Sequence, residues 1–194
     1  KLAIDADLVA HKPNSLSHND AAAIALTGLT ALVAIEDNLE LMANEKILIH
    51  GGAGGVGSYA VQLAHHIGAE VVTTASPINH EYLYSLGADK IIDYNTEDFD
   101  KILSNINVAF DLIGGEVHER TLNILNTGGR IAYIAPLLKN VKPPRSDIKI
   151  IRPNVNRDRA HLLRIIELYE LGAVVAPETK ILPLENIREA HNLI

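Results

Sequence analysis

A glycine-rich stretch at residues 51–58, with the sequence GGAGGVGS, constrains this chain more than any other segment. An apolar run at 46–50 precedes it, a helical pattern over 57–67 follows it, and a second apolar run comes at 71–74. A strand, a glycine loop, a helix and a strand in this order are the phosphate-binding half of a dinucleotide fold. A turn that served only for packing would not need so many glycines, because each costs backbone entropy.

Three of these glycines fit the spacing G-x-G-x-x-G, and the pattern predicts a separate role for each. We expect Gly52 to permit the tight turn after the strand, Gly54 to leave room for a pyrophosphate, and Gly57 to bring the helix close to the strand. The N–H groups that open the helix at Ser58 are expected to face the pyrophosphate, whose charge the helix dipole favours. The residues predicted to contact the cofactor here are Gly52, Ala53, Gly54, Gly55, Val56 and Gly57.

The rest of the chain alternates short apolar runs with helical patterns. Further strands are expected at 91–92, 108–113, 130–134, 148–151 and 179–182, with strand-like pieces at 2–4 and 8–9. Helices are expected at 20–36 (capped by Asn19 or Asp20), 35–42, 80–86, 98–105, 116–125, 157–171 and 184–193. This alternation predicts an α/β fold, a Rossmann doubly wound parallel sheet of about six strands with helices on both faces.

Composition excludes several classes of function. The 194 residues are 47% hydrophobic, which is enough for a sizeable core. A net charge of −7 without a basic run argues against nucleic acid or an anionic membrane surface as a partner. Cysteine is absent, so the chain itself has no thiolate for a disulfide, an iron–sulfur cluster or a zinc site. The apolar stretches are short and interrupted, and no membrane span is predicted.

The end of the second strand, at Thr74, Ala75 and Ser76, favours NADPH over NADH. An NAD site usually carries an acid about 20 residues past the last glycine, where it binds the ribose hydroxyls. Here that tip is neutral, so it does not repel a 2′-phosphate, and the Ser76 hydroxyl can donate to one. An S-adenosylmethionine methyltransferase also has a glycine loop but usually wants an acid at this strand end, which Ala75 is not.

The stretch HGGAGGVGSYAVQLA at 50–64 closely resembles the medium-chain dehydrogenase/reductase superfamily, in its zinc-independent, quinone oxidoreductase-like branch. Other pieces agree in order along the chain: LTGLTA at 26–31, SLGAD at 85–89, IDY at 92–94, FDLIGG at 110–115, GGR at 128–130, LPLE at 182–185 and EAH at 189–191. Members of this branch reduce quinones or the C=C bond of conjugated carbonyls, usually with NADPH. The resemblance therefore implies a hydride-transferring oxidoreductase whose partner is a small-molecule electrophile.

The resemblance also implies roles for residues outside the glycine loop. Thr30 would contact the phosphate on the nicotinamide side, and Ile113 and Gly114 would line the adenosine side. The family's usual basic partner of the 2′-phosphate is expected near 78–79, where this chain has Ile78 and Asn79. The other implied cofactor contacts are Tyr94, near the 2′-phosphate, and Ile134, Ala135 and Pro136, beside the nicotinamide carboxamide. Core packing or an ordinary helix position is the competing interpretation for Thr30, Tyr94, Ile113 and Ile134.

By the same resemblance, residues 1–17 are the tail of an absent GroES-like catalytic domain, 18–153 are the NAD(P)-binding domain, and 154–194 return towards the catalytic domain. Zinc-dependent members place a metal ligand near Ala23, and alanine cannot bind a metal. No cluster of His, Cys or carboxylate residues elsewhere has the spacing of a metal site, so we expect no metal. Catalytic residues are expected in the absent domain. We also expect a cytoplasmic protein, with a homodimer possible. A non-catalytic NADPH-binding structural or sensor module shares every motif and stays an alternative.

Overall fold

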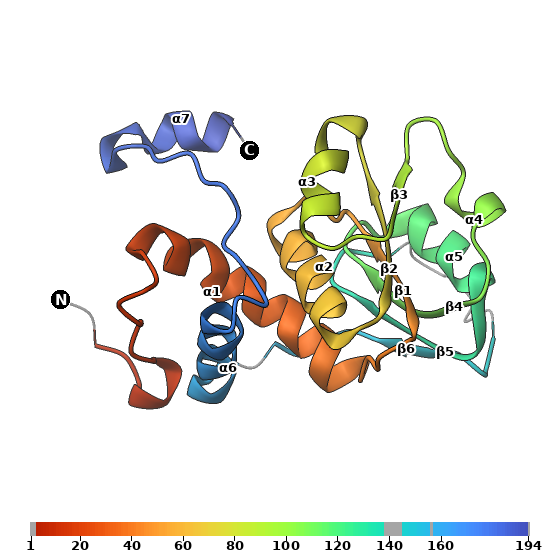
Figure 1. Ribbon diagram of the computed structural model, residues 1–194, viewed down its shortest axis with the longest axis horizontal. Coiled ribbons are helices and arrows are strands. Elements are labelled where there is room, and N and C mark those ends of the chain that lie inside the picture. The colour runs from red at the N-terminus through yellow and green to blue at the C-terminus, as the bar shows by residue number, and fades with distance from the viewer. Residues whose placement is uncertain (1–2, 138–144, 156, 194) are drawn as a thin grey trace.

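The computed structural model describes residues 3–137, 145–155 and 157–193, and these form a six-stranded sheet flanked by helices (Figure 1). All strand pairs are parallel, and the strand order is β3-β2-β1-β4-β5-β6. The strands are β1 (Lys46–His50), β2 (Glu70–Ala75), β3 (Lys90–Asp93), β4 (Ile106–Asp111), β5 (Leu125–Tyr133) and β6 (Lys149–Ile151). This order confirms the predicted doubly wound Rossmann fold.

The helices follow the strands in alternation. They are α1 (His18–Leu32), α2 (Gly55–Ile67), α3 (His80–Ser85), α4 (Phe99–Ile102), α5 (Gly115–Ile124), α6 (Arg159–Glu170) and α7 (Ile187–Asn192). The shorter turns are the 3-10 helices η1 (Ala6–Leu8), η3 (Pro77–Asn79) and η4 (Leu184–Asn186), and the π-helix η2 (Val33–Asn38). Figure 1 shows α1, α2 and α3 on one side of the sheet and α4 and α5 on the other.

The core forms two layers because successive strand residues point to opposite faces of the sheet. In β1, Ile47 and Ile49 join the larger buried cluster with α1, α2 and α6. Leu48, between them, joins a second cluster that includes Phe99 and Leu122 and lies under α4 and α5. Each of these strand residues is fully buried, so the sheet is covered on both faces, as a parallel sheet requires.

Helix α1 packs tightly against α2. Gly28 allows this approach, because a Cβ atom there would lie 2.9 Å from the ring of Tyr59. The continuous helical stretch His18–Asn38 is apolar and long enough, by length and composition, to cross a membrane, although the sequence predicted no such span. Half of its most apolar window is buried inside the protein, which is the burial of a core helix.

Several predicted element boundaries were wrong. The cap of α1 is Ser17, not Asn19 or Asp20: the Ser17 hydroxyl accepts the Asp20 N–H at 3.0 Å. The helix expected at 35–42 is the end of the π-turn, which closes where the Asn38 side chain donates to the Val33 carbonyl at 2.7 Å. Most other helix and strand bounds shift by one to a few residues.

Both ends of the chain depart further from expectation. The strand expected at 179–182 is irregular chain, and residues 3–9 hold the 3-10 turn η1 in place of a strand. Leu2 lies outside the described residues. Among those described, these segments pair with no strand, and Figure 1 shows both segments away from the sheet. Apolar runs without a neighbouring strand have no partner for their backbone hydrogen bonds, and they do not become strands.

An ionic cluster fastens α6 to the end of α1 and η2. Asp158 caps α6 by accepting the His161 N–H at 3.0 Å, and the His161 ring contacts Asp158 and Asp37, each at 2.8 Å. One turn later, Arg164 pairs with Glu36 at 3.0 Å. Partial burial lowers the pKa of His161, but its hydrogen bonds to Asp37 and Asp158 outweigh burial, so the pKa is raised.

We predict that this cluster makes stability pH-dependent. Because folding raises the pKa of His161, its contribution is complete below the unfolded value, near 6.5, and is lost as the pH rises through the folded value. His161→Gln should therefore lower the free energy of unfolding by about 0.2–1 kcal/mol at pH 6 and by less at pH 9. Urea unfolding of both proteins measures this, with the exposed His191→Gln as control. A loss that grows with pH would contradict the assignment.

Candidate functional site

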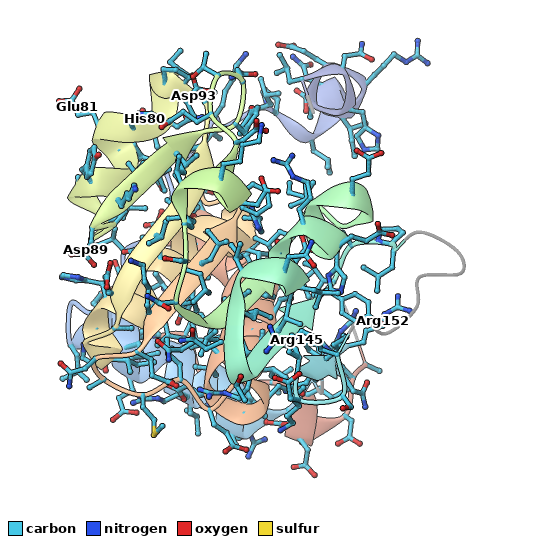
Figure 2. All side chains as sticks on the ribbon, turned by 90° about the vertical axis from the view of Figure 1, so that its right-hand side faces the viewer. His80, Glu81, Asp89, Asp93, Arg145 and Arg152 are labelled. Carbon is cyan, nitrogen blue, oxygen red and sulfur yellow. The ribbon has the colours of Figure 1, made fainter. Side chains whose placement is uncertain are left out.

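A pocket of about 300 Å³ opens at the carboxyl ends of the strands, where the strand order reverses between β2, β1 and β4. In doubly wound folds this switch point is where ligands bind. Figure 2 shows the orientation: Asp93 marks the carboxyl end of β3, and Asp89 lies just before its opposite end. The pocket is lined by His50, Gly51, Thr74, Tyr94, Glu97, Asp98, Phe99, Ile113, Val117 and Arg120.

The glycine loop borders this pocket, and its glycines divide the work differently from the prediction. The left-handed turn after β1 is made by Gly51, with φ +73°, and not by Gly52. Gly52 is required for close packing, since a Cβ there would collide with the Thr73 side chain on β2. A Cβ at Gly54 would touch only the Gly51 carbonyl, at 3.5 Å, so the space in front of Gly54 is open for a ligand.

Gly57 joins the helix to the turn. A Cβ at this position would lie 2.8 Å from the Cα of Gly52 and closer still to the Gly51 carbonyl oxygen. Helix α2 therefore rests directly on the backbone that leaves β1, which confirms the close approach predicted for Gly57. This contact points the first turn of α2 at the carboxyl edge of the sheet.

The helix begins earlier than predicted. Gly54 is the N-cap, and the Ser58 N–H already donates to its carbonyl at 2.8 Å. The first-turn N–H groups without an intrahelical acceptor are those of Gly55, Val56 and Gly57. These three groups, and not Ser58, are placed to donate to a phosphate at the positive end of the helix dipole.

A chain of hydrogen bonds fixes the turn at Gly51. The Gly51 N–H donates to the Thr74 hydroxyl at 3.2 Å, and this hydroxyl lies 3.3 Å from Nδ1 of His50. On the other side of the ring, Nε2 lies 2.9 Å from the Thr121 hydroxyl, which donates to the Val117 carbonyl at 2.6 Å. Because Thr121 spends its proton on Val117, Nε2 carries the ring proton and Nδ1 accepts from Thr74.

His50 is consequently a structural residue. Burial lowers its pKa to about 4, against the opposing charge of Asp111, so the ring is neutral at neutral pH. The neutral ring, with both nitrogens bonded, holds β1, β2 and α5 together. Its one N–H proton is held in the hydrogen bond to Thr121, so His50 is not a proton donor for a ligand.

A second polar cluster shapes the turn after β4, and the sequence reasoning missed it. Asp111 is fully buried and accepts the N–H groups of Ile113 at 2.9 Å and Gly114 at 2.8 Å, and the His118 ring at 2.9 Å. Burial raises the pKa of Asp111, but these three hydrogen bonds outweigh it and hold the pKa below its usual value. An acid between an apolar strand and a pair of glycines was the signal that could have identified this turn.

The same turn brings two predicted cofactor segments into contact. Gly114 has φ +75°, and a Cβ there would lie 3.1 Å from the Cβ of Ala135 and collide with the Pro136 carbonyl. The Gly115 N–H donates to that Pro136 carbonyl at 3.3 Å, and the Ile134 N–H donates to the Asp111 carbonyl at 3.2 Å. The segments after β4 and β5 therefore lie side by side.

Arg120 and Phe99 form one wall of the pocket, and the sequence analysis did not nominate either. Arg120 bonds to Asp98 at 2.8 Å and to Asp100, and its guanidinium lies 4.8 Å from the centre of the Phe99 ring. Phe99 in turn packs edge-on against His50, with ring centres 4.7 Å apart. Since two carboxylates already balance Arg120, it serves to hold the wall and is a poor candidate for binding a phosphate.

The residues predicted to contact the ribose lie together at the carboxyl end of β2 and just after it. Thr74 and Ala75 are buried, and the Ser76 hydroxyl accepts from the Asn79 side chain at 3.1 Å. Tyr94 lines the pocket with an exposed side chain. The Thr30 hydroxyl donates to the Leu26 carbonyl of its own helix at 2.9 Å. The α1 side chain that lies beside Gly55 is that of Thr27, one turn earlier.

The described residues contain no group of three or more His, Cys, Asp or Glu side chains that would hold a metal ion. His65 and His66 are exposed on α2, and the His65 ring lies against Gly87. Ala23 has no ligating atom. The glycine loop thus presents backbone N–H groups with open space in front of Gly54, which suits an anionic group of a ligand.

Comparison with known proteins matches this architecture. Residues 55–156 match the family described as zinc-binding dehydrogenase. A mitochondrial NAD(P)H oxidoreductase of Danio rerio is 37% identical over 142 residues, which cover 68% of this chain and 37% of that protein. The 2-methylene-furan-3-one reductase of Solanum lycopersicum is also 37% identical, over 134 residues, covering 68% of this chain and 34% of the reductase.

Solved structures agree over nearly the whole chain. The quinone oxidoreductase of Coxiella burnetii superposes with a TM-score of 0.85 at 31% identity, covering 95% of this chain and 59% of that one. The CurK enoyl reductase superposes with a TM-score of 0.82 at 27% identity, covering 95% of this chain and 61% of the reductase. The chain thus spans about a third of these two curated relatives and about three-fifths of these two structures.

We predict that Gly57→Ala destabilises the fold, whereas Gly54→Ala does not. The methyl group at 57 would force α2 away from the Gly51 carbonyl, and overpacking of this kind costs about 1–3 kcal/mol or more. At Gly54 the methyl group makes only an ordinary contact, and φ is −73°, which alanine adopts readily. Urea unfolding measures both variants. Equal stability of the two would refute the contact assigned to Gly57.

Proposed function

Since the chain belongs to the zinc-binding dehydrogenase family of the medium-chain dehydrogenase/reductase superfamily, we propose that it is the cofactor-binding part of an NADPH-dependent oxidoreductase. In this proposal a hydride passes from NADPH to a quinone or to the C=C bond of a conjugated carbonyl. The observation that carries it is the open space at Gly54, beside three unpaired N–H groups and the pocket at the switch point. Relatives named quinone oxidoreductase and 2-methylene-furan-3-one reductase support the substrate class.

The residues of this chain would hold the dinucleotide along the carboxyl ends of the strands. The N–H groups of Gly55, Val56 and Gly57 would donate to the pyrophosphate. Ile113, with Thr74 behind it, would line the adenosine side, where the pocket lies. Ile134, Ala135 and Pro136 would fix the carboxamide side, because the Asp111 turn already holds them in place.

NADPH is proposed over NADH because β2 ends without an acid that could bond the ribose hydroxyls. Ala75 is buried at that end, and Ser76 and Asn79 offer a hydroxyl and an amide in its place. Two solved structures that contain NADPH, a mycobacterial protein and the Escherichia coli quinone oxidoreductase, share this fold. From the resemblance we also propose that residues 1–17 and 154–194 adjoin a catalytic domain and that the protein binds no zinc. The resemblance likewise favours a cytoplasmic location, whereas the Danio rerio relative is named as mitochondrial.

Hydride transfer needs the nicotinamide beside an electrophilic carbon with water excluded. When bound, NADPH supplies the hydride. The residues of this chain would orient the cofactor, and His50 and Arg120, which line the pocket, are committed to structural bonds. We therefore place the groups that polarise the acceptor and protonate the product on the part of the protein that relatives have and this chain lacks.

We predict that this chain binds NADPH and that Gly54→Val abolishes binding with the fold intact. Valine would fill the space in front of the loop, where the pyrophosphate meets the backbone. Calorimetry with NADPH measures binding, and circular dichroism checks folding. The control is Ala43→Val, which adds the same side chain at an exposed position before β1, at the opposite edge of the sheet. NADPH binding retained by Gly54→Val would exclude the phosphate-loop assignment.

We further predict that this chain alone does not turn over, and that the chain joined to its catalytic domain does. Loss of the positioning of the acceptor can forfeit on the order of 7–11 kcal/mol of barrier lowering. The assay follows NADPH oxidation with 1,4-benzoquinone and a short conjugated alkenal, with the rate without enzyme subtracted. Turnover by this chain alone would contradict the two-domain account. A longer protein that binds NADPH without turnover would favour a structural or sensor module.

A further inference from the structure

An acidic residue, Asp93, lies at the carboxyl ends of β2 and β3, next to the position proposed for the ribose of the cofactor. Asp93, the last residue of β3, is paired in register with Ala75, the last residue of β2. An acid at this edge would suit the ribose hydroxyls of NADH and repel the 2′-phosphate of NADPH. The sequence analysis considered only the end of β2 and did not weigh Asp93.

The Asp93 carboxylate is engaged in hydrogen bonds within its own loop. It accepts the Asn95 N–H at 3.0 Å, the Asn95 side chain at 2.9 Å and the Thr96 hydroxyl at 2.9 Å. These bonds, that of the Asn95 N–H first, hold the pKa of Asp93 below its usual value. The carboxylate is thus charged but bonded within its own loop, with only 9% of the residue exposed.

His80 lies beside it, on the first turn of α3. Figure 2 shows His80 and Asp93 as neighbours at the carboxyl edge of the sheet, and the two groups interact electrostatically. The His80 side chain is half-buried, and its Nε2 lies 3.3 Å from the Ala75 carbonyl. A carbonyl can only accept, so this contact places the ring proton on Nε2.

With the proton of the neutral ring on Nε2, the charge of the ring decides whether Nδ1 accepts or donates a hydrogen bond. In the neutral ring Nδ1 presents a lone pair, which repels a phosphate oxygen; in the protonated ring Nδ1 becomes a charged donor, which attracts one. Within the described residues, Nδ1 of His80 has no hydrogen-bond partner. Histidine is the side chain whose charge changes between about pH 5 and 8.

We propose that His80 is the pH-dependent specificity residue for the ribose 2′-phosphate, acting with Ser76 and Asn79 at the end of β2. It takes the place of the permanent cation that Ile78 and Asn79 do not provide. The preference for NADPH over NADH is then strongest when His80 is protonated and narrows as the pH rises. This inference rests on the proposed function, because it requires the dinucleotide to occupy the glycine loop.

Two carboxylates lie on the elements around His80. Asp93 faces His80 from the β3 side, and Glu81 follows His80 on α3 and lies on the outer side of that helix in Figure 2. The part of β2 that leads to this edge, residues 71–75, brings no ionisable group, and neither does η3, with Pro77, Ile78 and Asn79; Glu70 lies at the opposite end of β2. A bound 2′-phosphate would add a second negative group beside the ring.

The test measures two affinities, for adenosine 2′,5′-bisphosphate and for AMP, on the wild-type chain and His80→Gln at pH 6.0 and 8.0. A phosphate itself titrates near pH 6, so the informative quantity is the ratio between the two proteins at each pH. We expect His80→Gln to weaken bisphosphate binding about tenfold at pH 6.0 and less than about twofold at pH 8.0. AMP binding should be unchanged at either pH.

Two further variants keep the result unambiguous. His80→Lys should restore tight bisphosphate binding at both pH values, because its charge persists at pH 8.0. His66→Gln, an exposed histidine on α2, should leave every affinity unchanged. An equal loss at both pH values, or no loss, would overturn the proposal for His80.

NADPH binding at pH 7.5, measured beside these, separates the two claims. If wild-type chain binds NADPH while the bisphosphate ratio is independent of pH, the inference fails and the proposed function stands. If it binds neither NADPH nor the bisphosphate, both fail. Nuclear magnetic resonance gives a direct readout: the resonances of the His80 ring should shift when adenosine 2′,5′-bisphosphate is added at pH 6.0 and not when AMP is added.

Discussion

The close contact between the first turn of α2 and the backbone leaving β1 is the constraint on which the rest of the site depends. It exists because Gly57 has no side chain and because Gly51 can take a positive φ. A methyl group at Gly57 would tilt the helix, and the N–H groups of its first turn would no longer point along the carboxyl edge of the sheet. The phosphate-binding geometry is therefore a consequence of backbone packing, not of any charged side chain.

Buried polar groups then hold the loops that surround this contact. The neutral His50 ring ties the turn at Gly51 to α5 through Thr74 and Thr121, and Asp111 orders the turn after β4 through two backbone N–H groups. Unpaired polar groups this deeply buried would cost stability, so each has its partners. Arg120, which lines the pocket, is committed in the same way to Asp98 and Asp100.

At the other end of the molecule the protein relies on charge. Helix α6 is held to η2 through His161, Asp37 and Asp158 and through Arg164 with Glu36. Exposed ion pairs are individually weak, and they respond to pH and salt. The nucleotide site and the docking of α6 therefore rest on different physics, and changes of pH act on them separately.

The sequence by itself determined the fold class, the order of the strands along the chain, the glycine loop and the neutral end of β2. These follow from patterns that repeat within a few residues, so neighbouring residues are enough to read them. Only the tertiary structure decided that Gly51 makes the turn, that the strand expected at 179–182 has no partner, and that Asp111 and Arg120 are engaged. It also decided that Asp93 and His80 meet at Ala75. Ala75 and Asp93, 18 positions apart, become neighbours through strand register, and register is set by packing across the whole sheet.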